Sequence, residues 1–509
     1  MKCKLTIKDQ CNVKFDGLDA VLRKKLIAKL KYVDPTARFS HAFQLKRWDG
    51  KIAFFSMGGG TYYNMLPYIL TDILDAGYEI DIDDQRPETS WEFPVINEEV
   101  LADKGIVWPE GHVLAGDPIM LREHQVRAIN GYLENYQSMG KIATGAGKTV
   151  ITAVLSLLVG EVTGGRSIVI VPSKSLVVQT EADFKNIGLD VGVFFGDRKE
   201  LNRQHTICTW QSLAVLNKKG STRKKKNGKF VTESTFDETF DINAFLKNVN
   251  CVIVDEAHGA KAKELKELLC GPMANIPLRW GMTGTVPKED YQFASVLAGI
   301  GAVMIEISSE ELIEKDVLAK CTIDIVQLQL QKTMGDFADW DCEKKYLNTN
   351  PDIMRWLADF TQTVTENGST LLLVENIETG KMLERMIPDS TFVYGNVSVD
   401  DRKVEYKKVD NSKNNILIAT YGVAAVGINM TFLYNVILYN SGKSPVKILQ
   451  SVGRGLRRGE SELVDMKKTS VQIYDVCSDL KYSKRHLSLR KSFYKEEKFP
   501  FTLTKVVLV

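Results

Sequence analysis

Five continuous apolar runs, each followed by a helical or turn segment, constrain the fold of this chain more than any other feature. The runs occupy residues 167–172, 251–256, 370–375, 415–420 and 435–440. A strand that is apolar along its whole length is typically covered on both faces, and its alternation with helices predicts a parallel sheet with right-handed crossovers. The series occurs twice, in residues 118–307 and 308–480. We therefore predict an α/β chain with two doubly wound parallel-sheet domains.

The two ends of the chain have a different pattern. Residues 1–113 predict a small N-terminal α/β accessory domain of order β-α-β-β-α-β. Its expected elements are helices at 18–30 and 67–76, strands within 39–55 that turn at Asp49-Gly50, and a closing strand at 78–83. A polar stretch at 84–117 is typical of a linker, and residues 481–509 form a basic C-terminal tail. The predicted domains are thus 1–113, 114–307, 308–480 and 481–509.

The charge distribution is more informative than the total charge. The formal net charge is only +2, so composition alone indicates no polyanionic partner. Residues 1–51, however, contain 13 Lys or Arg and 5 Asp, a net charge of 13 − 5 = +8. A second basic cluster, Arg223 to Lys226, lies in a polar insertion at 217–240 that we expect to be a flexible loop or a hairpin. Such clusters indicate either basic binding faces or solvated surface.

The cysteines and the apolar runs bear on the compartment. The 8 cysteines are scattered without Cys-x-x-Cys spacing, which argues against a disulfide framework or a zinc site. The N-terminus has no apolar signal core, and no run approaches the ~18 apolar residues of a membrane span. We therefore expect a soluble intracellular protein without a membrane partner. No helix pattern demands association, so we expect a monomer.

The strongest local motif is Ala143-Thr-Gly-Ala-Gly-Lys-Thr149, between a short strand and an apolar helix. A bound triphosphate needs close backbone approach, N–H donors at a helix N-terminus, a cation and a hydroxyl for Mg²⁺. Gly145 and Gly147 permit the approach, and Lys148 and Thr149 supply the cation and the hydroxyl. Thr144 and Ala146 complete the loop. The strict pattern has Gly six residues before the Lys, where this chain has Ile142.

A second motif, Cys251-Val-Ile-Val-Asp-Glu-Ala-His258, is an apolar strand that ends in two adjacent carboxylates. Asp255 is suited to hold Mg²⁺, and Glu256 is suited to orient and deprotonate the attacking water. The same four residues could instead begin a capped helix. Because both motifs occur in the correct order and each follows a buried strand, we predict a site for ATP and Mg²⁺.

A third motif lies about 200 residues further on, in Gln450-Ser-Val-Gly-Arg-Gly-Leu-Arg457. Arg454 and Arg457 are three residues apart and would share one helical face. Planar, permanently charged guanidinium groups suit the charge that develops in phosphoryl transfer. A basic surface helix is the alternative, although Gln450 and the Gly-Arg-Gly sequence argue against it.

These motifs and those between them, taken in order over residues 119–458, resemble the superfamily-2 helicases. The resemblance implies two tandem RecA-like domains that bind ATP·Mg²⁺ between them. It also implies that Gln125 reads the adenine base, that Arg122 borders it, and that Gly427 lines the nucleotide cleft. Thr283-Gly-Thr285 resembles the motif that couples hydrolysis to domain movement. At Asn429 the family usually has Asp, so the part of that residue in nucleotide coupling is left open.

The same resemblance implies a set of residues that contact nucleic acid along the motor. In the first domain the matching sequences are Val171-Pro-Ser173 and Thr209-Trp-Gln-Ser212, and in the second Ala419-Thr-Tyr421 begins the matching motif. The implied contact residues are Pro172, Ser173, Thr209, Trp210, Gln211 and Thr420.

A narrower resemblance is to the phage UvsW-type helicases, which remodel branched DNA in recombination. It rests on the small N-terminal unit with Trp48-Asp-Gly50, on Tyr421-Gly-Val423, and on the run from Gly453 to Arg458. It implies DNA as the track (branched, forked or single-stranded), branch migration or fork regression as the activity, and the host cytoplasm as the compartment if the chain is phage-encoded.

The N-terminal residues allow two interpretations. Phe39, Phe43 and Trp48 lie among Lys24, Lys25, Lys46 and Arg47, which together make a workable surface for stacking bases and binding phosphates, with Trp48 as a contact. Alternatively the aromatics form the small core and the lysines are solvated. Similarly, the basic tail from Lys481 to Lys498 either packs as a helix on the motor or touches DNA.

Three other activities share the motor motifs. They are a double-strand DNA translocase that never separates strands, an RNA helicase, and an ATP-gated nucleic-acid clamp. Nothing in the sequence resembles a nuclease or a methyltransferase, which weakens the restriction-type translocase. Glu256 together with Arg457 argues against the clamp, because a clamp has no need of fast hydrolysis.

Overall fold

The computed structural model describes residues 1–34, 36–110, 114–200, 203–217, 222–226, 229–233, 242–257, 262–287, 290–330, 337–395, 397, 399–410, 412–425, 430, 432–442, 459–461 and 466–508. The chain divides into two compact units. One comprises Met1–Ile142 with Lys148–Glu306, and the other comprises Ile307–Val509 with the loop Ala143–Gly147. Within the described residues, no helix is long and apolar enough to cross a membrane.

Residues 1–84, which we call the N-terminal region, are built on a small mixed sheet. Its elements are β1 (Lys2–Ile7), β2 (Asn12–Asp16), α1 (Ala20–Lys29), β3 (Lys31–Val33), η1 (Ala37–Phe39), α2 (His41–Gln44), β4 (Lys51–Ala53), β5 (Gly60–Tyr62), η2 (Tyr63–Tyr68), α3 (Leu70–Asp75) and β6 (Glu79–Asp84). The strand order is β5-β2-β1-β6, with β1 antiparallel to β2 and parallel to β6. The helices and the closing strand therefore lie where the sequence predicts them.

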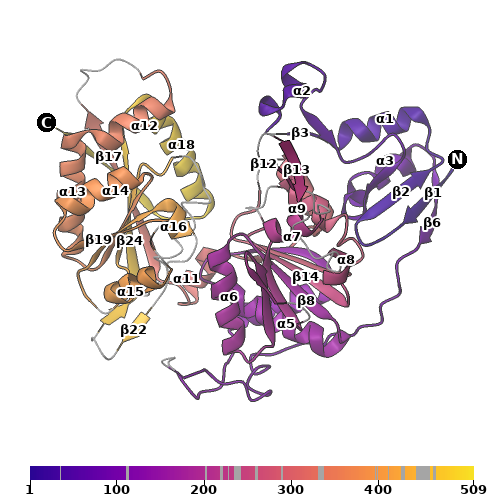
Figure 1. Cartoon of the computed structure of the whole chain (residues 1–509), viewed down its shortest axis with the longest axis horizontal. Helices are drawn as coiled ribbons and strands as arrows, with labels where there is room; N and C mark the ends of the chain where they lie inside the picture. The colour runs from indigo at the N-terminus through magenta and orange to yellow at the C-terminus, as the bar shows by residue number, and fades with distance from the viewer. Residues whose placement is uncertain are drawn as a thin grey trace. The chain divides into compact units, whose positions relative to one another are not determined.

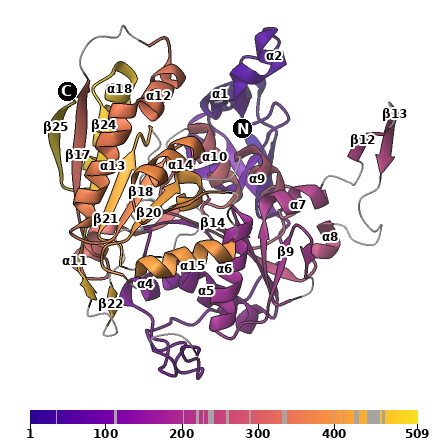
Figure 2. The ribbon, with the colours of Figure 1, turned by 60° about the vertical axis from the view of Figure 1, so that its left-hand side comes forward.

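The prediction of strands within 39–55 was wrong for most of that segment. The structure has the short helices η1 and α2 there, followed by β4, which pairs with β3. The predicted turn at Asp49-Gly50 is present, with Gly50 at φ 74°. A Cβ at Gly50 would lie 2.8 Å from the Phe43 ring, so only glycine fits this turn. Both views show α2 at the tip of the N-terminal region (Figures 1 and 2).

The N-terminal region shares a hydrophobic core with the domain that follows it. Side chains such as Leu5, Phe15 and Leu26 cluster with Tyr291 and Leu297, which belong to helix α10 (Asp290–Gly299). Hydrogen bonds add to this contact: the backbone N–H of Gln10 donates to the Ala274 carbonyl at 2.9 Å, and Asn12 Nδ2 donates to the Cys270 carbonyl at 2.8 Å. The region is therefore packed against the next domain as well as connected to it by residues 85–118.

The first large sheet carries the first series of buried strands. The described elements of this domain are α4 (Glu123–Glu134), β7 (Gln137–Ile142), α5 (Lys148–Thr163), β8 (Arg166–Val171), α6 (Lys174–Asn186), β9 (Val191–Phe195), β10 (Arg198–Lys199), β11 (His205–Thr209), α7 (Trp210–Asn217), β12 (Thr222–Lys226), β13 (Lys229–Glu233), α8 (Ile242–Phe245), β14 (Val249–Asp255), α9 (Ala262–Leu269), β15 (Leu278–Thr283), α10 and β16 (Val303–Ile307). The order is β10-β9-β11-β8-β14-β15-β7-β16, and the strands from β9 to β7 pair in parallel. Helices α7 to α10 share one core with the sheet, and α5 and α6 pack together beside it (Figure 1).

The insertion at 217–240, which we expected to be a flexible loop or a hairpin, contains a hairpin. Strands β12 and β13 pair antiparallel, from Thr222 opposite Glu233 to Lys226 opposite Lys229. The rest of the insertion lies outside the described residues, apart from the end of α7.

A buried arginine fixes the helices on which the N-terminal region packs. Arg279 on β15 is fully buried and donates to the carbonyls of Leu269 at 2.7 Å, Met273 at 2.6 Å and Gly299 at 2.8 Å. These carbonyls lie at the ends of α9 and α10 and in the loop between α9 and β15. A guanidinium with several fixed donors suits this task, because unpaired buried carbonyls and an unpaired buried cation are both costly.

The second large sheet has seven strands, and every neighbouring pair is parallel. The described elements of this domain are α11 (Ser309–Glu314), β17 (Lys320–Leu330), α12 (Trp340–Thr349), α13 (Pro351–Thr365), β18 (Thr370–Val374), α14 (Ile377–Met386), β19 (Ser390–Val393), α15 (Val399–Asp410), β20 (Ile416–Thr420), α16 (Tyr421–Ala425), β21 (Asn435–Tyr439), β22 (Gly459–Ser461), β23 (Met466–Lys468), β24 (Ser470–Ser478), α18 (Lys481–Glu496) and β25 (Phe501–Leu508). The order is β19-β20-β18-β21-β24-β17-β25. Strands β22 and β23 pair with one another in a separate two-stranded sheet. All five apolar runs of the sequence thus form parallel strands in the two large sheets.

The C-terminal residues belong to this second sheet. Helix α18 packs on β24, and β25 pairs in parallel with β17 at the sheet edge (Figure 2). Of the two interpretations of the basic tail, the structure agrees with a helix packed on the second large domain. The proposed domain boundary at 480 stays a prediction.

One buried histidine makes the stability of the first large domain depend on pH. His205 on β11 is 4% exposed, and its Nδ1 lies 2.7 Å from Ser156 Oγ. Burial lowers the pKa of His205 from 6.5 to about 4. The fold therefore favours the neutral ring, and this stabilisation is complete above pH 6.5 and is lost as the pH falls toward 4.

We expect the His205 ring to account for about 3 kcal/mol of lost stability between pH 6.5 and pH 4, because each pKa unit corresponds to about 1.4 kcal/mol. Denaturant unfolding of the native protein and of His205→Asn, measured at pH 7, 6, 5 and 4.5, tests this. The variant should be less stable at pH 7 but lose less on acidification. Exposed His41→Asn is the control. Equal acid sensitivity of the native protein and His205→Asn would contradict the assignment.

Candidate functional site

Five neighbouring strands of the first large sheet end at the same edge. Strands β11, β8, β14, β15 and β7 pair in parallel in that order, so their carboxyl ends coincide. The residues that follow these ends are Trp210 with Gln211, Pro172 with Ser173, Glu256, Gly284 with Thr285, and the loop Ala143–Gly147. Motifs spread over more than 140 residues of sequence are therefore brought to one edge.

The loop between β7 and α5 depends on its two glycines. Gly145 has φ 90° and Gly147 has φ 84°, and both values lie in the left-handed region that other residues avoid. Between them Ala146 is fully buried, and its N–H donates to the Ala143 carbonyl at 3.3 Å. Helix α5 begins at Lys148, directly after Gly147, so the loop leads into a helix N-terminus. This backbone is of the kind that receives phosphate groups.

The side chain of Lys148 reaches the paired carboxylates. It is 12% exposed, and its Nζ lies 3.8 Å from Glu256 Oε1 and 3.4 Å from the Ile142 carbonyl. The fold thus brings together two residues that the sequence separates by 256 − 148 = 108 positions. A nucleotide phosphate would carry more negative charge than the single Glu256 carboxylate. Lys148 can therefore leave Glu256 and bind the phosphate instead.

Asp255 ends β14 in a position suited to a metal ion. Its Oδ1 accepts a hydrogen bond from the Glu256 N–H at 2.9 Å. Burial, and after it the Glu256 charge, raises the pKa of the Asp255 carboxyl to about 6, while the Lys148 charge and the hydrogen bond from the Glu256 N–H oppose this shift. When a carboxyl group has a raised pKa, a nearby cation stabilises its charged form. Together with the Thr149 hydroxyl at the start of α5, Asp255 therefore fits Mg²⁺.

Glu256 has a strained backbone. Its φ is 50°, in the left-handed region, and its side chain is 16% exposed. The following Ala257 N–H donates to the Met282 carbonyl at 3.1 Å, which ties the turn to β15. A non-glycine residue held in this conformation costs of order 1 kcal/mol, and such residues gather at functional sites.

Two threonines, Thr283 and Thr285, hydrogen-bond to one another across the turn after β15. Thr283 Oγ1 donates to the Thr285 carbonyl at 2.7 Å and accepts from the Thr285 N–H at 3.2 Å. Because β15 lies between β14 and β7, this turn stands between the carboxylates and the phosphate loop. Thr152 adds a link that the sequence did not reveal, since its Oγ1 donates to the Lys148 carbonyl at 2.9 Å and contacts Met282 Sδ at 3.3 Å.

Gln125 and Arg122 lie at the start of α4. Gln125 is 7% exposed, and its Oε1 accepts from the Arg122 N–H at 2.9 Å, which fixes the first turn of the helix. Helix α4 packs on β7 and on α5, which are the two elements that flank the phosphate loop in the sequence. Recognition of adenine by Gln125 and Arg122 stays a prediction.

Two of the predicted nucleic-acid contacts have hydroxyl groups that cap helices. Ser173 Oγ accepts from the Leu176 N–H at 3.3 Å at the start of α6. Thr209 is 4% exposed, and its Oγ1 lies 2.9 Å from Ser212 Oγ at the start of α7. Pro172 and Trp210 are half-buried, Gln211 is exposed, and Thr420 is 9% exposed at the end of β20. Contacts with nucleic acid stay predictions for all of them.

Trp48 lies in the N-terminal region and is half-buried, and its contact with nucleic acid stays a prediction. Four other predicted site residues lie outside the described part of the chain. They are Gly427, Gln450, Arg454 and Arg457.

Comparisons with known proteins agree with this geometry. Residues 118–288 match the family "Type III restriction enzyme, res subunit", and residues 352–459 match the family "Helicase conserved C-terminal domain". The chain is 23% identical over 504 residues to the ATP-dependent DNA helicase uvsW of Enterobacteria phage T4, covering 92% of this chain and 93% of the relative. The chain is a superfamily-2 helicase.

The chain is also similar to a viral protein in sequence and to a solved structure in fold. The chain is 24% identical over 370 residues to putative helicase 22 of a Sulfolobus islandicus filamentous virus, covering 67% of this chain and 62% of that protein. A fragment structure of a putative HsdR subunit of a type I restriction enzyme from Vibrio vulnificus superposes with a TM-score of 0.52 at 18% identity, covering 81% of this chain and 73% of the fragment. This helicase thus has two RecA-like domains and an N-terminal α/β region, and it hydrolyses ATP.

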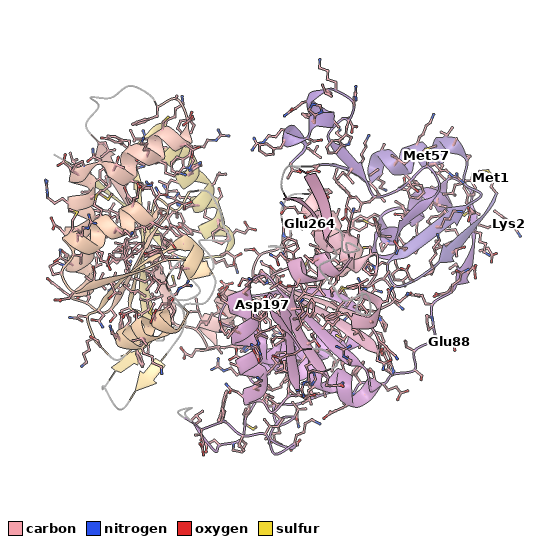
Figure 3. The ribbon with its side chains drawn as sticks, viewed as in Figure 1. Met1, Lys2, Met57, Glu88, Asp197 and Glu264 are labelled. Carbon is pink, nitrogen blue, oxygen red and sulfur yellow. The ribbon has the colours of Figure 1, made fainter. Side chains whose placement is uncertain are left out.

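We expect Glu256→Gln to leave the affinity for ATP within about threefold of the native value and to lower the turnover number by roughly 100-fold or more, because the carboxylate is assigned to the water and not to nucleotide binding. Binding of a fluorescent ATP analogue and steady-state ATPase assays separate the two effects. Asp197→Asn, which neutralises an exposed carboxylate of the same domain (Figure 3), is the control and should behave as the native protein. Retained turnover in Glu256→Gln would exclude the assignment.

Proposed function

We propose that this helicase is an ATP-driven DNA motor that remodels branched DNA by branch migration, fork regression or unwinding, in phage-type recombination, repair or replication. One observation carries the choice of DNA structure: a projecting cluster of exposed aromatic and cationic side chains on the N-terminal region, which is itself packed on the first motor domain. The likeness to a T4 DNA helicase over nearly its whole length supports DNA as the track.

The chemistry of the proposed ATP site follows from the residues at the sheet edge. Lys148 and the N–H groups of the loop from Thr144 to Gly147 hold the phosphates, and Thr149 with Asp255 holds Mg²⁺. A bound Mg²⁺ supplies neutralisation of the phosphate charge. Glu256 orients the water and accepts its proton, and the left-handed backbone at this residue supports that assignment, because strain of this kind is retained where a side chain must have one direction.

The second domain completes the proposed reaction through residues known from sequence alone. Arg454 and Arg457 stabilise the charge of the transferring phosphoryl group, and Gln450 and Gly427 support them. Arg122 and Gln125 recognise the base. Alternating closure and opening of the two domains then moves the strand along the contacts that begin at Pro172, Trp210 and Thr420.

The projecting cluster, which we define as residues 38–49, presents a surface for nucleic acid. Phe39 is 72% exposed and Phe43 is 39% exposed, so neither ring belongs to the core of the region. The Arg38 guanidinium lies 4.7 Å from the centre of the Phe39 ring. Exposed rings and cations in alternation suit unpaired bases and phosphates, such as those at a fork or a junction.

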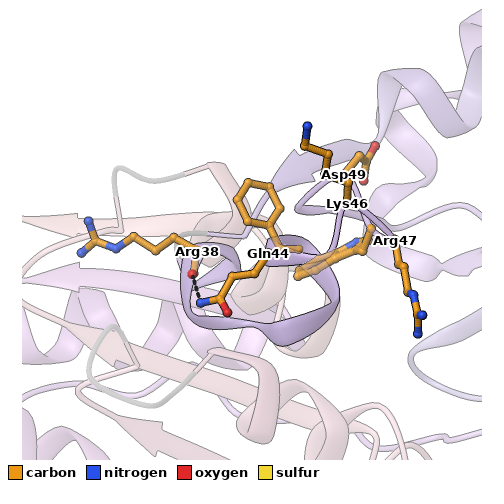
Figure 4. A pocket seen from close by; sticks show the side chains of 7 residues that line it. Arg38, Gln44, Lys46, Arg47 and Asp49 are labelled. Atoms are coloured by element: carbon orange, nitrogen blue, oxygen red, sulfur yellow. Dashed lines mark hydrogen bonds between the residues drawn. The ribbon is translucent and has the colours of Figure 1, made fainter.

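The cluster also has a preformed shape. A hollow of about 600 Å³ is lined by Arg38, Phe43, Gln44, Lys46, Arg47, Trp48 and Asp49, and Figure 4 shows the labelled cations pointing outward around it. The indole N–H of Trp48 donates to the Lys51 carbonyl at 2.8 Å, and Asp49 pairs with Lys31 at 2.6 Å. The turn is therefore rigid, which lowers the entropy cost of binding a strand there.

The direct test is ATP turnover by the full chain with single-stranded DNA, duplex DNA, forked DNA, a four-way junction, and single-stranded and duplex RNA. We expect forks and junctions to stimulate turnover most, at least fivefold above duplex, and the junction to be converted to products. Native-gel analysis of labelled junctions measures the conversion.

Other outcomes would point to the alternatives. Stimulation by duplex DNA without strand displacement would indicate a translocase, and equal stimulation by RNA would indicate an RNA helicase. An absence of stimulation by any nucleic acid would indicate a clamp, and each of these results would contradict the proposal.

We expect the double variant Phe39→Ala/Phe43→Ala to bind a four-way junction at least 10-fold more weakly, because stacking of one base contributes about 1–3 kcal/mol. Its ATPase rate without DNA should not change. Tyr68→Ala removes a ring that is 44% exposed outside the cluster and is the matched control. Junction titrations by fluorescence anisotropy at fixed salt give the affinities. Unchanged junction affinity in the double variant would mean that residues 38–49 are not the DNA surface.

A further inference from the structure

Two cysteines from distant parts of the sequence meet where the N-terminal region packs on the first motor domain. Cys11 lies in the turn before β2, and Cys270 directly follows α9, 270 − 11 = 259 positions further on. Both thiols are free in the structure. Cys270 packs against the apolar core that the N-terminal region shares with α10. The pair therefore lies across the contact between the accessory region and the motor.

Hydrogen bonds hold the two thiol groups against one another. The Cys270 thiol donates to the Cys11 sulfur, and the Cys11 thiol donates to the Leu269 carbonyl at 3.5 Å. The backbone of both cysteines is also held, because Asn12 Nδ2 donates to the Cys270 carbonyl at 2.8 Å and the Tyr63 N–H donates to the Cys11 carbonyl at 2.7 Å. The fold thus keeps two sulfur atoms from separate domains facing one another.

The two thiols differ in their exposure to solvent. Cys11 is fully buried, whereas Cys270 is partly exposed. A small molecule can therefore approach the pair from the side of Cys270, while a second protein chain cannot reach Cys11. This arrangement favours a bond within the chain over a bond between two chains.

A buried cation lies beside the pair. Arg279 Nη2 donates to the same Leu269 carbonyl at 2.7 Å. The hydrogen bond from Cys270 lowers the pKa of the Cys11 thiol most, and the Arg279 charge lowers it further, against the effect of burial. The same hydrogen bond, followed by burial, raises the pKa of Cys270. The pair thus loses one proton readily, and the S–H that remains stabilises the thiolate.

Other buried cysteines of the chain have a different environment. Burial raises the pKa of the Cys208 thiol well above its usual value, and it raises the pKa of Cys321 to about 12. Those thiols behave as small apolar side chains, because the thiolate is the form that reacts. Cys11 and Cys270 combine a facing partner, a nearby cation and a route from solvent.

We propose that Cys11 and Cys270 form a reversible disulfide that ties the accessory region covalently to the motor, with a hydroperoxide such as H2O2 as the oxidant. One thiolate of the pair attacks the O–O bond, becomes a sulfenic acid, and releases water once a proton is taken up. The other thiol attacks the sulfenic sulfur, the S–S bond forms, and a second water leaves. Two thiols and one H2O2 thus give one disulfide and two waters, and a dithiol reductant reverses the change by exchange.

The first test maps the bond in the full-length native protein. After brief treatment with H2O2, quenching and digestion without reductant, mass spectrometry should find the Cys11 and Cys270 peptides linked in most chains. Dithiothreitol should abolish the link. Cys342→Ser changes an exposed cysteine of α12 and is the matched control, with an unchanged yield. If both thiols of the treated native protein stay unlinked, the proposal is wrong, and this result requires no variant to fold.

The second test asks whether the bond holds the accessory region in place. A cross-link restricts the unfolded chain, and its effect is greatest for long loops. In moderate urea, the backbone amides of β1 and β2 should exchange hydrogen about 10-fold more slowly in the oxidised protein than in the reduced protein, because local opening is suppressed. Hydrogen-exchange mass spectrometry measures this.

Cys270→Ser treated with the same peroxide is the control for this second test, since its methionines are oxidised under the same conditions while the link cannot form. It should exchange at the same rate with and without peroxide. Equal exchange in the oxidised and reduced native protein would overturn the tethering role even where the linked peptide is found. Neither test depends on ATP hydrolysis or on DNA, so the proposed function stands or falls separately.

Discussion

In a parallel sheet every strand ends at the same edge, and the loops after neighbouring strands cannot avoid one another. In the first RecA-like domain this geometry brings the phosphate loop, the Asp255-Glu256 pair and the Thr283-Gly-Thr285 turn together, although they come from three separate strands. The order β14-β15-β7 then makes the threonine turn the neighbour of both other parts. Parallel pairing is the constraint on which the 3.8 Å contact between Lys148 and Glu256 depends.

The sequence predicts those parts of the fold whose chemistry or burial requires fixed residue types. The two glycines of the phosphate loop could be recognised because a left-handed backbone beside a phosphate leaves no alternative, and both have a positive φ in the structure. The five apolar runs could be recognised because strands covered on both faces have few polar positions. The apolar run before Asp255 placed this residue correctly at the end of a strand. The glycines before Lys148 placed that residue correctly at the start of a helix.

Other parts could not be predicted because the sequence does not show which backbone carbonyls the fold brings around a side chain. Arg279 looks like an ordinary charged residue, yet it is buried and donates to carbonyls of three separate segments. The segment around Phe39 and Phe43 was wrongly predicted as strands, and the structure has short helices there. Whether its aromatic rings are exposed or form a small core was left open by the sequence, and the structure exposes both rings. Ser173 and Thr209 illustrate a subtler difficulty, because a hydroxyl that caps a helix and one that binds a phosphate have the same sequence pattern.

The shared core of the N-terminal region and α10 limits how this helicase can be divided. Tyr291 and Leu297 lie on a motor helix, yet they pack among side chains of β1, β2 and α1. Cutting the chain at the linker would leave that apolar helix face uncovered on the motor and would open the core of the excised region. The accessory region therefore cannot be exchanged between motors by itself. A chimera that transfers it to another motor must also transfer the face of α10 on which it packs.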